Sequence, residues 1–252
     1  MANIAHQLAL PFAHRADFAA ADFLAAPSNE AALAWLARGT DWPEGRLALF
    51  GEAGVGKTHL LHIWARREKA AVWSGPMLRG FAELPATGGI ALDDADAANE
   101  VALFHLINAA AEAGRALLLA GRAAPSRWPV RLPDLASRLR ATTAVRILPA
   151  EDALCRALLA RLLAERQLMV PQSLQDWVLA RLPRSQGAIR EAAARLDRAG
   201  LAAGGISRAV AAQVVAVLDD AAQWDAAQWD AEQWEEPHEF FLDISPPGPN
   251  LL

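Results

Sequence analysis

The amino-acid sequence predicts an α/β fold: a parallel sheet flanked by helices, followed by a small all-helical region and an acidic tail. Short apolar runs alternate with helical patterns up to Pro149, and only helical patterns follow as far as Leu218. Residues 219–252 then hold nine acidic residues and no Lys or Arg. Strands that alternate with helices favour a parallel sheet, because the crossovers between parallel strands are usually helical.

Five short apolar segments are typical of buried strands, and helical patterns lie before and between them. The expected strands are 47–50, 71–73, 90–92, 116–120 and 144–148, and the expected helices in this half are 29–37, 58–69 and 99–113. Four amphipathic patterns follow without a strand between them, at 151–165, 172–182, 185–199 and 207–218. We therefore expect four parts: an arm (1–20), an α/β domain (21–149), a helical domain (150–218) and a tail (219–252).

Composition limits the class of protein. The chain has 252 residues and is 54% hydrophobic, enough for one sizeable domain and a small one. Its one cysteine, Cys155, excludes an internal disulfide and a cysteine-based zinc site. Because no apolar run is long enough to span a bilayer and the amino terminus is unlike a signal peptide, we expect a cytosolic protein without a membrane partner.

Charge is distributed unevenly. The formal net charge is −5, but residues 1–218 alone carry +4. A mildly basic body is compatible with weak nucleic-acid contact without requiring it.

The tail contains a five-residue repeat that places Trp224, Trp229 and Trp234 at equal spacing, each followed by an acidic residue. On a helix, successive Trp would step by about 140° and form no single stripe. Two interpretations stay open: a disordered tail expanded by duplication, or a tandem peptide ligand with Trp anchors. The acidity argues against nucleic acid as the ligand.

Residues 51–58 read G-x-x-x-x-G-K-T, which is typical of a loop that binds nucleotide phosphates. The loop follows an expected strand and precedes an expected helix, as the motif requires. Backbone N–H groups of such a loop surround phosphate oxygens, and the helix amino end adds favourable partial charge. The nucleotide-binding candidates are Gly51, Gly54, Val55, Gly56, Lys57 and Thr58, with Lys57 reaching the outer phosphates and Thr58 ligating Mg²⁺.

A second motif lies about 35 residues further on, where the expected strand 90–92 ends in Asp93 and Asp94. A strand that ends in two carboxylates, at this distance after a phosphate loop, favours the interpretation that it is the second motif of a nucleotide-binding site. Asp93 would position Mg²⁺ through water, and Asp94 would polarise an attacking water.

The order of these motifs and two later ones resembles that of the AAA+ ATPases of the bacterial DnaA type, over about residues 4–218. Arg138, within Leu135-Ala136-Ser137-Arg138-Leu139, is similar to the arginine finger that acts in trans. Arg190 is similar to the arginine of the lid domain, and Phe23 to the segment that lines the adenine pocket. The resemblance implies ADP or ATP with Mg²⁺ as cofactor, and it leaves homo-oligomers open.

The amino-terminal residues narrow this resemblance. An extended peptide near the amino terminus contains Gln7, Leu8, Leu10, Pro11 and Phe12. It is similar to the sliding-clamp-binding peptide of the Hda family. Members of that family are DnaA-related regulators that inactivate the initiator. Gln would hydrogen-bond at one end while Leu and Phe fill apolar pockets. DnaA initiators continue into a basic DNA-binding domain, whereas an acidic tail follows here. We therefore expect no sequence-specific binding of double-stranded DNA.

Arg122 departs from the family pattern, because it falls where DnaA-type proteins carry a sensor-1 Asp. An Arg there would either hold phosphate charge or pair with Asp93 or Asp94. The substitution argues against efficient self-hydrolysis and leaves nucleotide binding intact.

The resemblance therefore implies a cytoplasmic, replisome-associated regulator with the polymerase III sliding clamp and DnaA as partners. It would suppress replication initiation by stimulating hydrolysis of DnaA-bound ATP through Arg138. Two alternatives stay open: a self-hydrolysing AAA+ ATPase, such as a helicase loader or a remodelling factor on DNA, and a non-catalytic clamp adaptor that uses the Trp tail.

Overall fold

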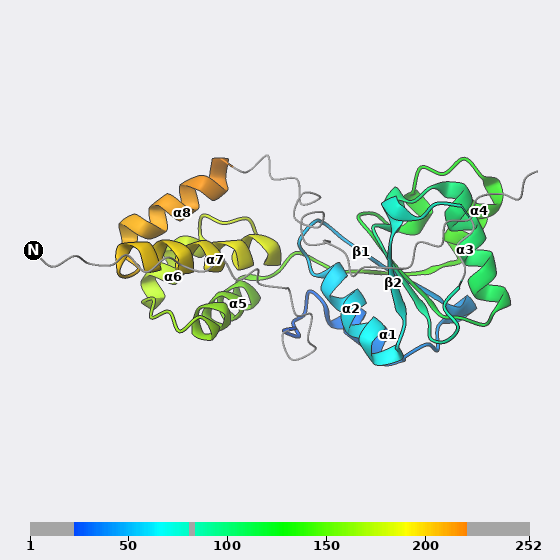
Figure 1. Ribbon diagram of the computed structural model, residues 1–252, viewed down its shortest axis with the longest axis horizontal. Helices are drawn as coiled ribbons and strands as arrows, with labels where there is room; N and C mark the ends of the chain where they lie inside the picture. Colours follow the sequence, from blue (N-terminus) through cyan, green and yellow to red (C-terminus); the bar gives the residue numbers. More distant parts are fainter. Residues whose placement is uncertain (1–22, 81–83, 221–252) are drawn as a thin grey trace, which may run out of the picture.

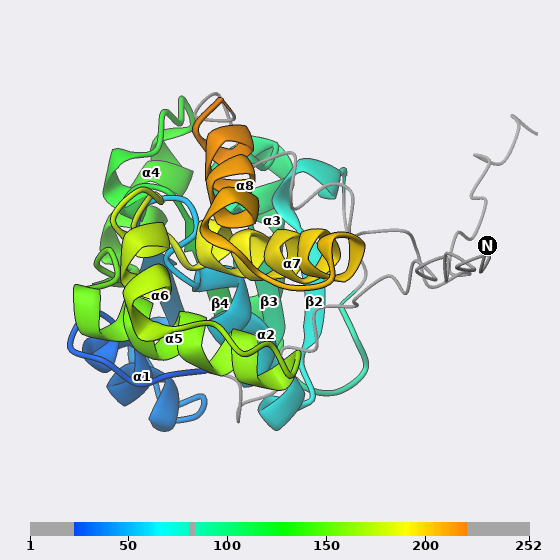
Figure 2. The same ribbon diagram turned by 90° about the vertical axis from the view of Figure 1, so that its left-hand side faces the viewer.

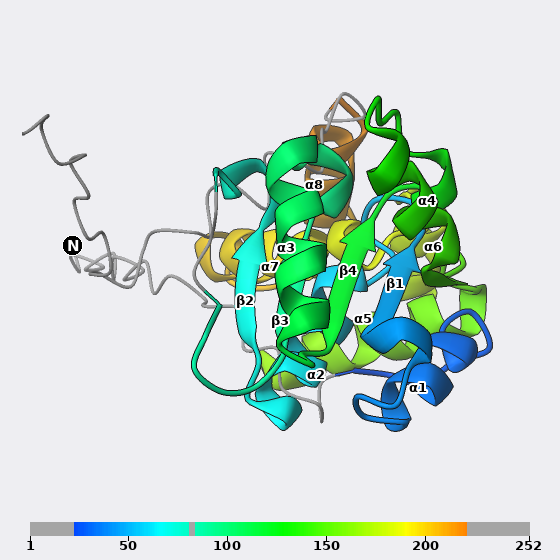
Figure 3. The same ribbon diagram turned by 90° about the vertical axis from the view of Figure 1, so that its right-hand side faces the viewer.

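The computed structural model describes residues 23–80 and 84–220, the last two of these for their backbone only. Five parallel strands form one sheet in the order β2-β3-β4-β1-β5. Figure 3 shows β2, β3, β4 and β1 in that order behind α3. The strands are β1 (Arg46–Phe50), β2 (Ala71–Ser74), β3 (Ile90–Asp93), β4 (Leu117–Gly121) and β5 (Thr143–Arg146). The prediction of a parallel sheet flanked by helices is confirmed.

Helices cover both faces of the sheet, because the strands are apolar on both sides. Alternate strand residues such as Leu47 and Leu118 pack against α1 (Glu30–Ala37) and α2 (Lys57–Glu68). Their neighbours, such as Ala48 and Leu117, pack against α3 (Glu100–Glu112) and α4 (Pro133–Ala141). This is the pattern expected of strands buried on both faces.

Four helices without a strand make up the rest of the described chain. They are α5 (Asp152–Glu165), α6 (Gln172–Leu179), α7 (Gln186–Ala203) and α8 (Arg208–Asp220). They share a separate apolar core that includes Leu159, Ile189 and Leu196. Figure 1 shows this helical part at one end of the α/β part, and Figure 2 looks at the molecule from that end.

The expected strands and helices overlap the observed ones, with shifts at their ends. The fifth strand begins at Thr143 and ends at Arg146, yet Ile147 still donates from its backbone N–H to the Phe50 carbonyl at 2.8 Å. Helix α4 was not among the expected helices, although Pro133 at its first position is a known start signal.

Two sequence-based predictions lie outside the described residues. The clamp-binding peptide falls within residues 1–22 and the Trp repeats fall after Asp220, so both stay predictions. Among the described residues, the longest apolar helical stretches fall short of what a membrane crossing needs.

Candidate nucleotide-binding site

The phosphate loop lies between β1 and α2, as the sequence predicts. Helix α2 begins at Lys57, and Gly56 precedes it with φ 101°, a conformation that side-chain-bearing residues rarely adopt. No side chain caps the amino end of α2. Its first backbone N–H groups therefore stay available to an anion, and the partial charge of the helix favours one there.

Lys57 is buried within the loop, with 8% of its surface exposed. Its Nζ donates to the carbonyls of Gly51 at 3.0 Å and Glu52 at 2.9 Å. Burial lowers the pKa of Lys57, while the carboxylates of Asp93 and Asp94 act to raise it. The ammonium is thus held in place by loop carbonyls that a phosphate can replace.

Thr58 and Asp93 meet at the carboxyl end of β3. The Thr58 hydroxyl donates to Oδ2 of Asp93 at 2.7 Å, and Asp93 is 6% exposed. A hydroxyl and a carboxylate oxygen suit Mg²⁺, which proteins usually share with substrate phosphates rather than enclose. In the described part of the chain, no group of three or more His, Cys, Asp or Glu is placed to hold a metal ion by itself.

Asp94 lies beside this pair in a left-handed backbone conformation, with φ 46°. Burial raises the pKa of the Asp94 carboxyl, and the charges of Asp93 and Asp96 raise it further. Lys57 and Arg122 oppose that shift. A half-buried carboxylate with a raised pKa at the edge of a phosphate loop is suited to accept a proton from water.

Arg122 directly follows β4 and is exposed. Its backbone N–H donates to Oδ2 of Asp96 at 2.7 Å. Its positive charge lowers the pKa values of both Lys57 and Asp94. Arg122 therefore belongs electrostatically to this site, where it favours the ionised form of Asp94.

The start of α7 docks directly on the phosphate loop, a contact that the sequence analysis missed. The backbone N–H of Gln186 donates to the Gly54 carbonyl at 2.9 Å, and its side-chain Nε2 donates to the Val55 carbonyl at 3.3 Å. Gln186 is 8% exposed. The two segments are about 130 residues apart, so no local pattern signals the contact.

His59, in the first turn of α2, contacts both Arg190 and Phe23. The sequence did not predict this role for His59. Its Nδ1 lies 3.3 Å from Nη2 of Arg190 on α7. Its ring lies edge-on to that of Phe23, with centroids 5.3 Å apart. Phe23 also approaches Gly56, since a Cβ there would lie 3.3 Å from the Phe23 ring. Phe23 and Arg190 are therefore both brought to the first turn of α2.

Arg138 lies elsewhere, on α4. Its guanidinium carbon is 5.6 Å from the centroid of Phe104 on α3, and the side chain is half-buried. Arg138 contributes to the lowered pKa of Arg46, the first residue of β1, whereas the phosphate loop follows the last residue of that strand. Figure 1 shows α4 at the end of the α/β part opposite the helical part.

Comparison with known proteins supports this fold. No family model matches the chain. Domain III of the Thermotoga maritima replication initiation protein DnaA is similar, with TM-score 0.68 and 15% identity over 81% of this chain and 97% of that one. AMPPCP-bound DnaA from Aquifex aeolicus gives TM-score 0.56 and 18% identity, covering 66% of this chain and 60% of that one.

A motor protein has a similar fold. The Thermotoga maritima RuvB Holliday junction branch migration motor gives TM-score 0.58 and 17% identity, covering 74% of this chain and 68% of that one. The chain thus shares its fold with DnaA domain III and with the RuvB motor.

Proposed function

We propose that this chain is an Hda-like regulator that binds ADP or ATP with Mg²⁺ and stimulates hydrolysis of ATP bound to DnaA. The observation that carries the proposal is the separation of two arginines. Arg190 approaches the chain's own phosphate loop through His59, whereas Arg138 lies on α4 beside Phe104, and its charge acts on Arg46 at the start of β1. An arginine in that position is available to a second protein's nucleotide.

Different residues of the chain have different roles in this proposal. Residues 51–58 hold the phosphates, Thr58 and Asp93 supply oxygen atoms for Mg²⁺, and Phe23 lies near the loop. Gln186 holds the start of α7 to the loop through the carbonyls of Gly54 and Val55, and Arg190 would place positive charge near a bound nucleotide. Arg138 stabilises charge that develops on the transferring phosphoryl group of DnaA-bound ATP.

The first test is Arg138→Ala, with initiator-bound ATP hydrolysis measured in the presence of DNA-loaded sliding clamp. Arginine fingers contribute roughly 10³ to 10⁵ in rate, so stimulation should be lost while clamp binding persists. Arg140→Ala, on the same helix and exposed, is the matched control and should retain stimulation. Full stimulation by Arg138→Ala would overturn the mechanism.

The second test concerns the tether. Gln7→Ala combined with Leu8→Ala should abolish clamp binding in a pull-down, because both the hydrogen bond and one apolar anchor are lost. Asn3→Ala lies outside the peptide and should bind as the unchanged chain does. Retained binding by the double variant would mean that residues 7–12 are not the contact.

A self-hydrolysing ATPase is the second candidate. The hydrogen bond between Thr58 and Asp93, beside an Asp94 whose pKa is raised, favours it because both motifs of the chain's own site are together. This candidate predicts sizeable intrinsic ATP turnover that Asp94→Asn abolishes and Arg122→Asp increases. Under the first proposal, intrinsic turnover is weak and stimulation depends on Arg138.

A further inference from the structure

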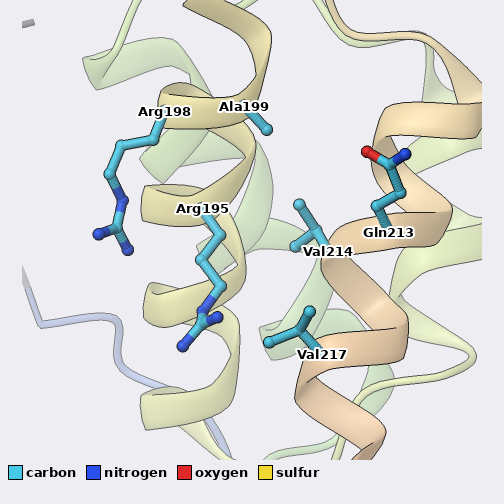
Figure 4. A pocket seen from close by; sticks show the side chains of 6 residues that line it. All are labelled: Arg195, Arg198, Ala199, Gln213, Val214 and Val217. Atoms are coloured by element: carbon cyan, nitrogen blue, oxygen red, sulfur yellow. The ribbon is translucent and has the colours of Figure 1, made fainter. Parts of the chain in front are cut away.

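A groove of about 460 Å³ lies between α7 and α8. Its lining residues come from these two helices: Arg195, Arg198, Ala199, Gln213, Val214 and Val217. Figure 4 shows Val214 and Val217 directed from α8 toward α7, while Arg195 and Arg198 project from α7. The groove therefore combines an apolar wall with a positively charged edge.

The apolar wall is incompletely covered. Val214 is 5% exposed and packs into the helical core, but Val217 is 50% exposed. Sites of roughly 300 to 1,000 Å³ take drug-sized ligands, so this groove has room for one aromatic side chain. Burial of an aromatic ring against Val217 would remove apolar surface from water.

The charged edge carries more positive than negative charge. Nε of Arg195 lies 2.6 Å from Oε1 of Glu191, and Nη2 of Arg198 lies 3.4 Å from the same oxygen. Two guanidinium groups thus share one carboxylate. The Arg198 side chain is 69% exposed and makes the longer contact. A second carboxylate beside Arg198 would therefore be electrostatically favourable.

The tail contains both an aromatic ring and a carboxylate within each Trp–acid pair. Each of Trp224, Trp229 and Trp234 is followed directly by an acidic residue, and residues 219–252 contain no Lys or Arg. The same dipeptide thus offers an aromatic ring for the apolar wall and a carboxylate for the charged edge.

The tail also begins close to the groove. Val217 lies three residues before the end of α8, which is about 4.5 Å along the helix axis. Trp224 follows Asp220 by four residues, a reach of up to about 14 Å, and the later Trp reach further. A short tether of this kind gives an effective concentration on the order of millimolar, so a weak contact suffices.

We propose that the groove between α7 and α8 binds the chain's own tail, with one Trp–acid pair docked at a time. The Trp ring covers Val217, and the acid that follows it pairs with Arg198. This docking needs neither the nucleotide nor the initiator, so it stands apart from the proposed function.

The test is hydrogen–deuterium exchange of the full chain, followed by mass spectrometry over residues 195–217. Replacing all three tail residues by Ala (Trp224→Ala, Trp229→Ala, Trp234→Ala) should speed exchange there roughly three- to tenfold, because an undocked groove opens more often. The control is Phe240→Ala with Phe241→Ala, which changes the tail outside the Trp–acid pairs. This control should exchange as the unchanged chain does.

Reversing the charge of Arg198, and then the charges of the tail acids, separates tail docking from a simple loss of stability. Arg198→Glu should speed exchange as the triple Trp variant does. Adding Asp225→Arg, Asp230→Arg and Glu235→Arg to that variant should restore slow exchange, because opposite charges face one another again.

Two results would overturn the proposal. The first is identical exchange in the triple Trp variant and the unchanged chain. The second is protection that disappears on dilution together with a dimer seen by light scattering, because the groove would then hold the tail of a second copy.

Discussion

At the scale of single residues, His62 on α2 has surroundings that disfavour its charged form. Burial, with smaller contributions from the charges of Arg66 and His59, lowers the pKa of His62 to about 4. The folded protein therefore keeps this imidazole neutral at pH values where an unfolded chain would protonate it.

The sign of the pH dependence follows from this difference. Between about pH 6.5 and pH 4 the unfolded state binds the proton and the folded state does not, so stability falls as pH falls through that window. We expect His62→Gln to remove about 2 kcal/mol of this loss, allowing for solvent screening. Urea unfolding of both proteins at pH 7 and pH 4.5 measures this loss of unfolding free energy.

A second variant checks the cause. Arg66→Ala removes one of the charges that lower the pKa of His62, so it should weaken the pH dependence without abolishing it. If both variants lose stability with acid as steeply as the unchanged chain does, another group is responsible.

The placement of residues was predictable where motif spacing carried it. The sequence assigned Thr58 and Asp93 to one Mg²⁺ site, and the structure brings their side chains within 2.7 Å. Gln186 and His59 were not predictable in this way. Their partners are about 130 residues away, and neither residue belongs to a motif whose chemistry requires it.

At the scale of elements, the phosphate loop and the start of α7 fit closely at Gly54. Its φ is +73°, and a Cβ there would lie 2.7 Å from Cβ of Ser185. Gly114, in the turn after α3, has a similar φ of +62° with nothing within 4 Å of an added Cβ. Both glycines have a positive φ that would strain a residue with a side chain, and they differ in the space around them.

Substituting Ala at Gly114 and at Gly54 separates backbone strain from the loss of space beside α7. Gly114→Ala should cost about 1 kcal/mol of stability from backbone strain alone. Gly54→Ala should cost more and should push the start of α7 off the loop, because the backbone beside Ser185 has to move. Nucleotide affinity and hydrogen exchange over residues 185–190 measure the difference. Equal behaviour of the two variants would show that the contact at Gly54 is unimportant.

Element type was predictable where apolar patterns were strong. The strands of the α/β part are short apolar runs, and each was located to within a few residues. Helix α4 was not expected because its apolar contacts are few: Leu135 and Leu139 are its buried residues. Its start signal, Pro133 followed by Asp134, lies next to the arginine-finger segment and would have identified the helix.

At the scale of the whole molecule, the candidate nucleotide site depends on the packing of the helical core. Ile189 belongs to the helical core, while Gln186 and Arg190 on either side of it face the phosphate loop and α2. The packing of α7 against α5 therefore sets the position of the groups that reach the loop.

Leu159→Ala tests this dependence. Leu159 on α5 is fully buried in the helical core, and such truncations cost about 2 to 5 kcal/mol. We expect weaker nucleotide binding together with faster exchange in α5 and α7, while the sheet stays protected. Leu201→Ala, at a position 67% exposed on α7, should change stability by less than about 0.5 kcal/mol. Unchanged affinity in Leu159→Ala would mean that the loop binds nucleotide without α7.

The contact between Gln186 and the phosphate loop also has a consequence for synthesis of the chain. The last strand of the sheet ends at Arg146, but the residues that complete the site come from α7, which ends at Ala203. At roughly 5 to 20 residues per second, a ribosome needs about 3 to 11 seconds for that interval. During this time residues 51–58 lack their contacts with Gln186 and Arg190, so under the proposed function nucleotide binding would be completed only after α7 has been translated.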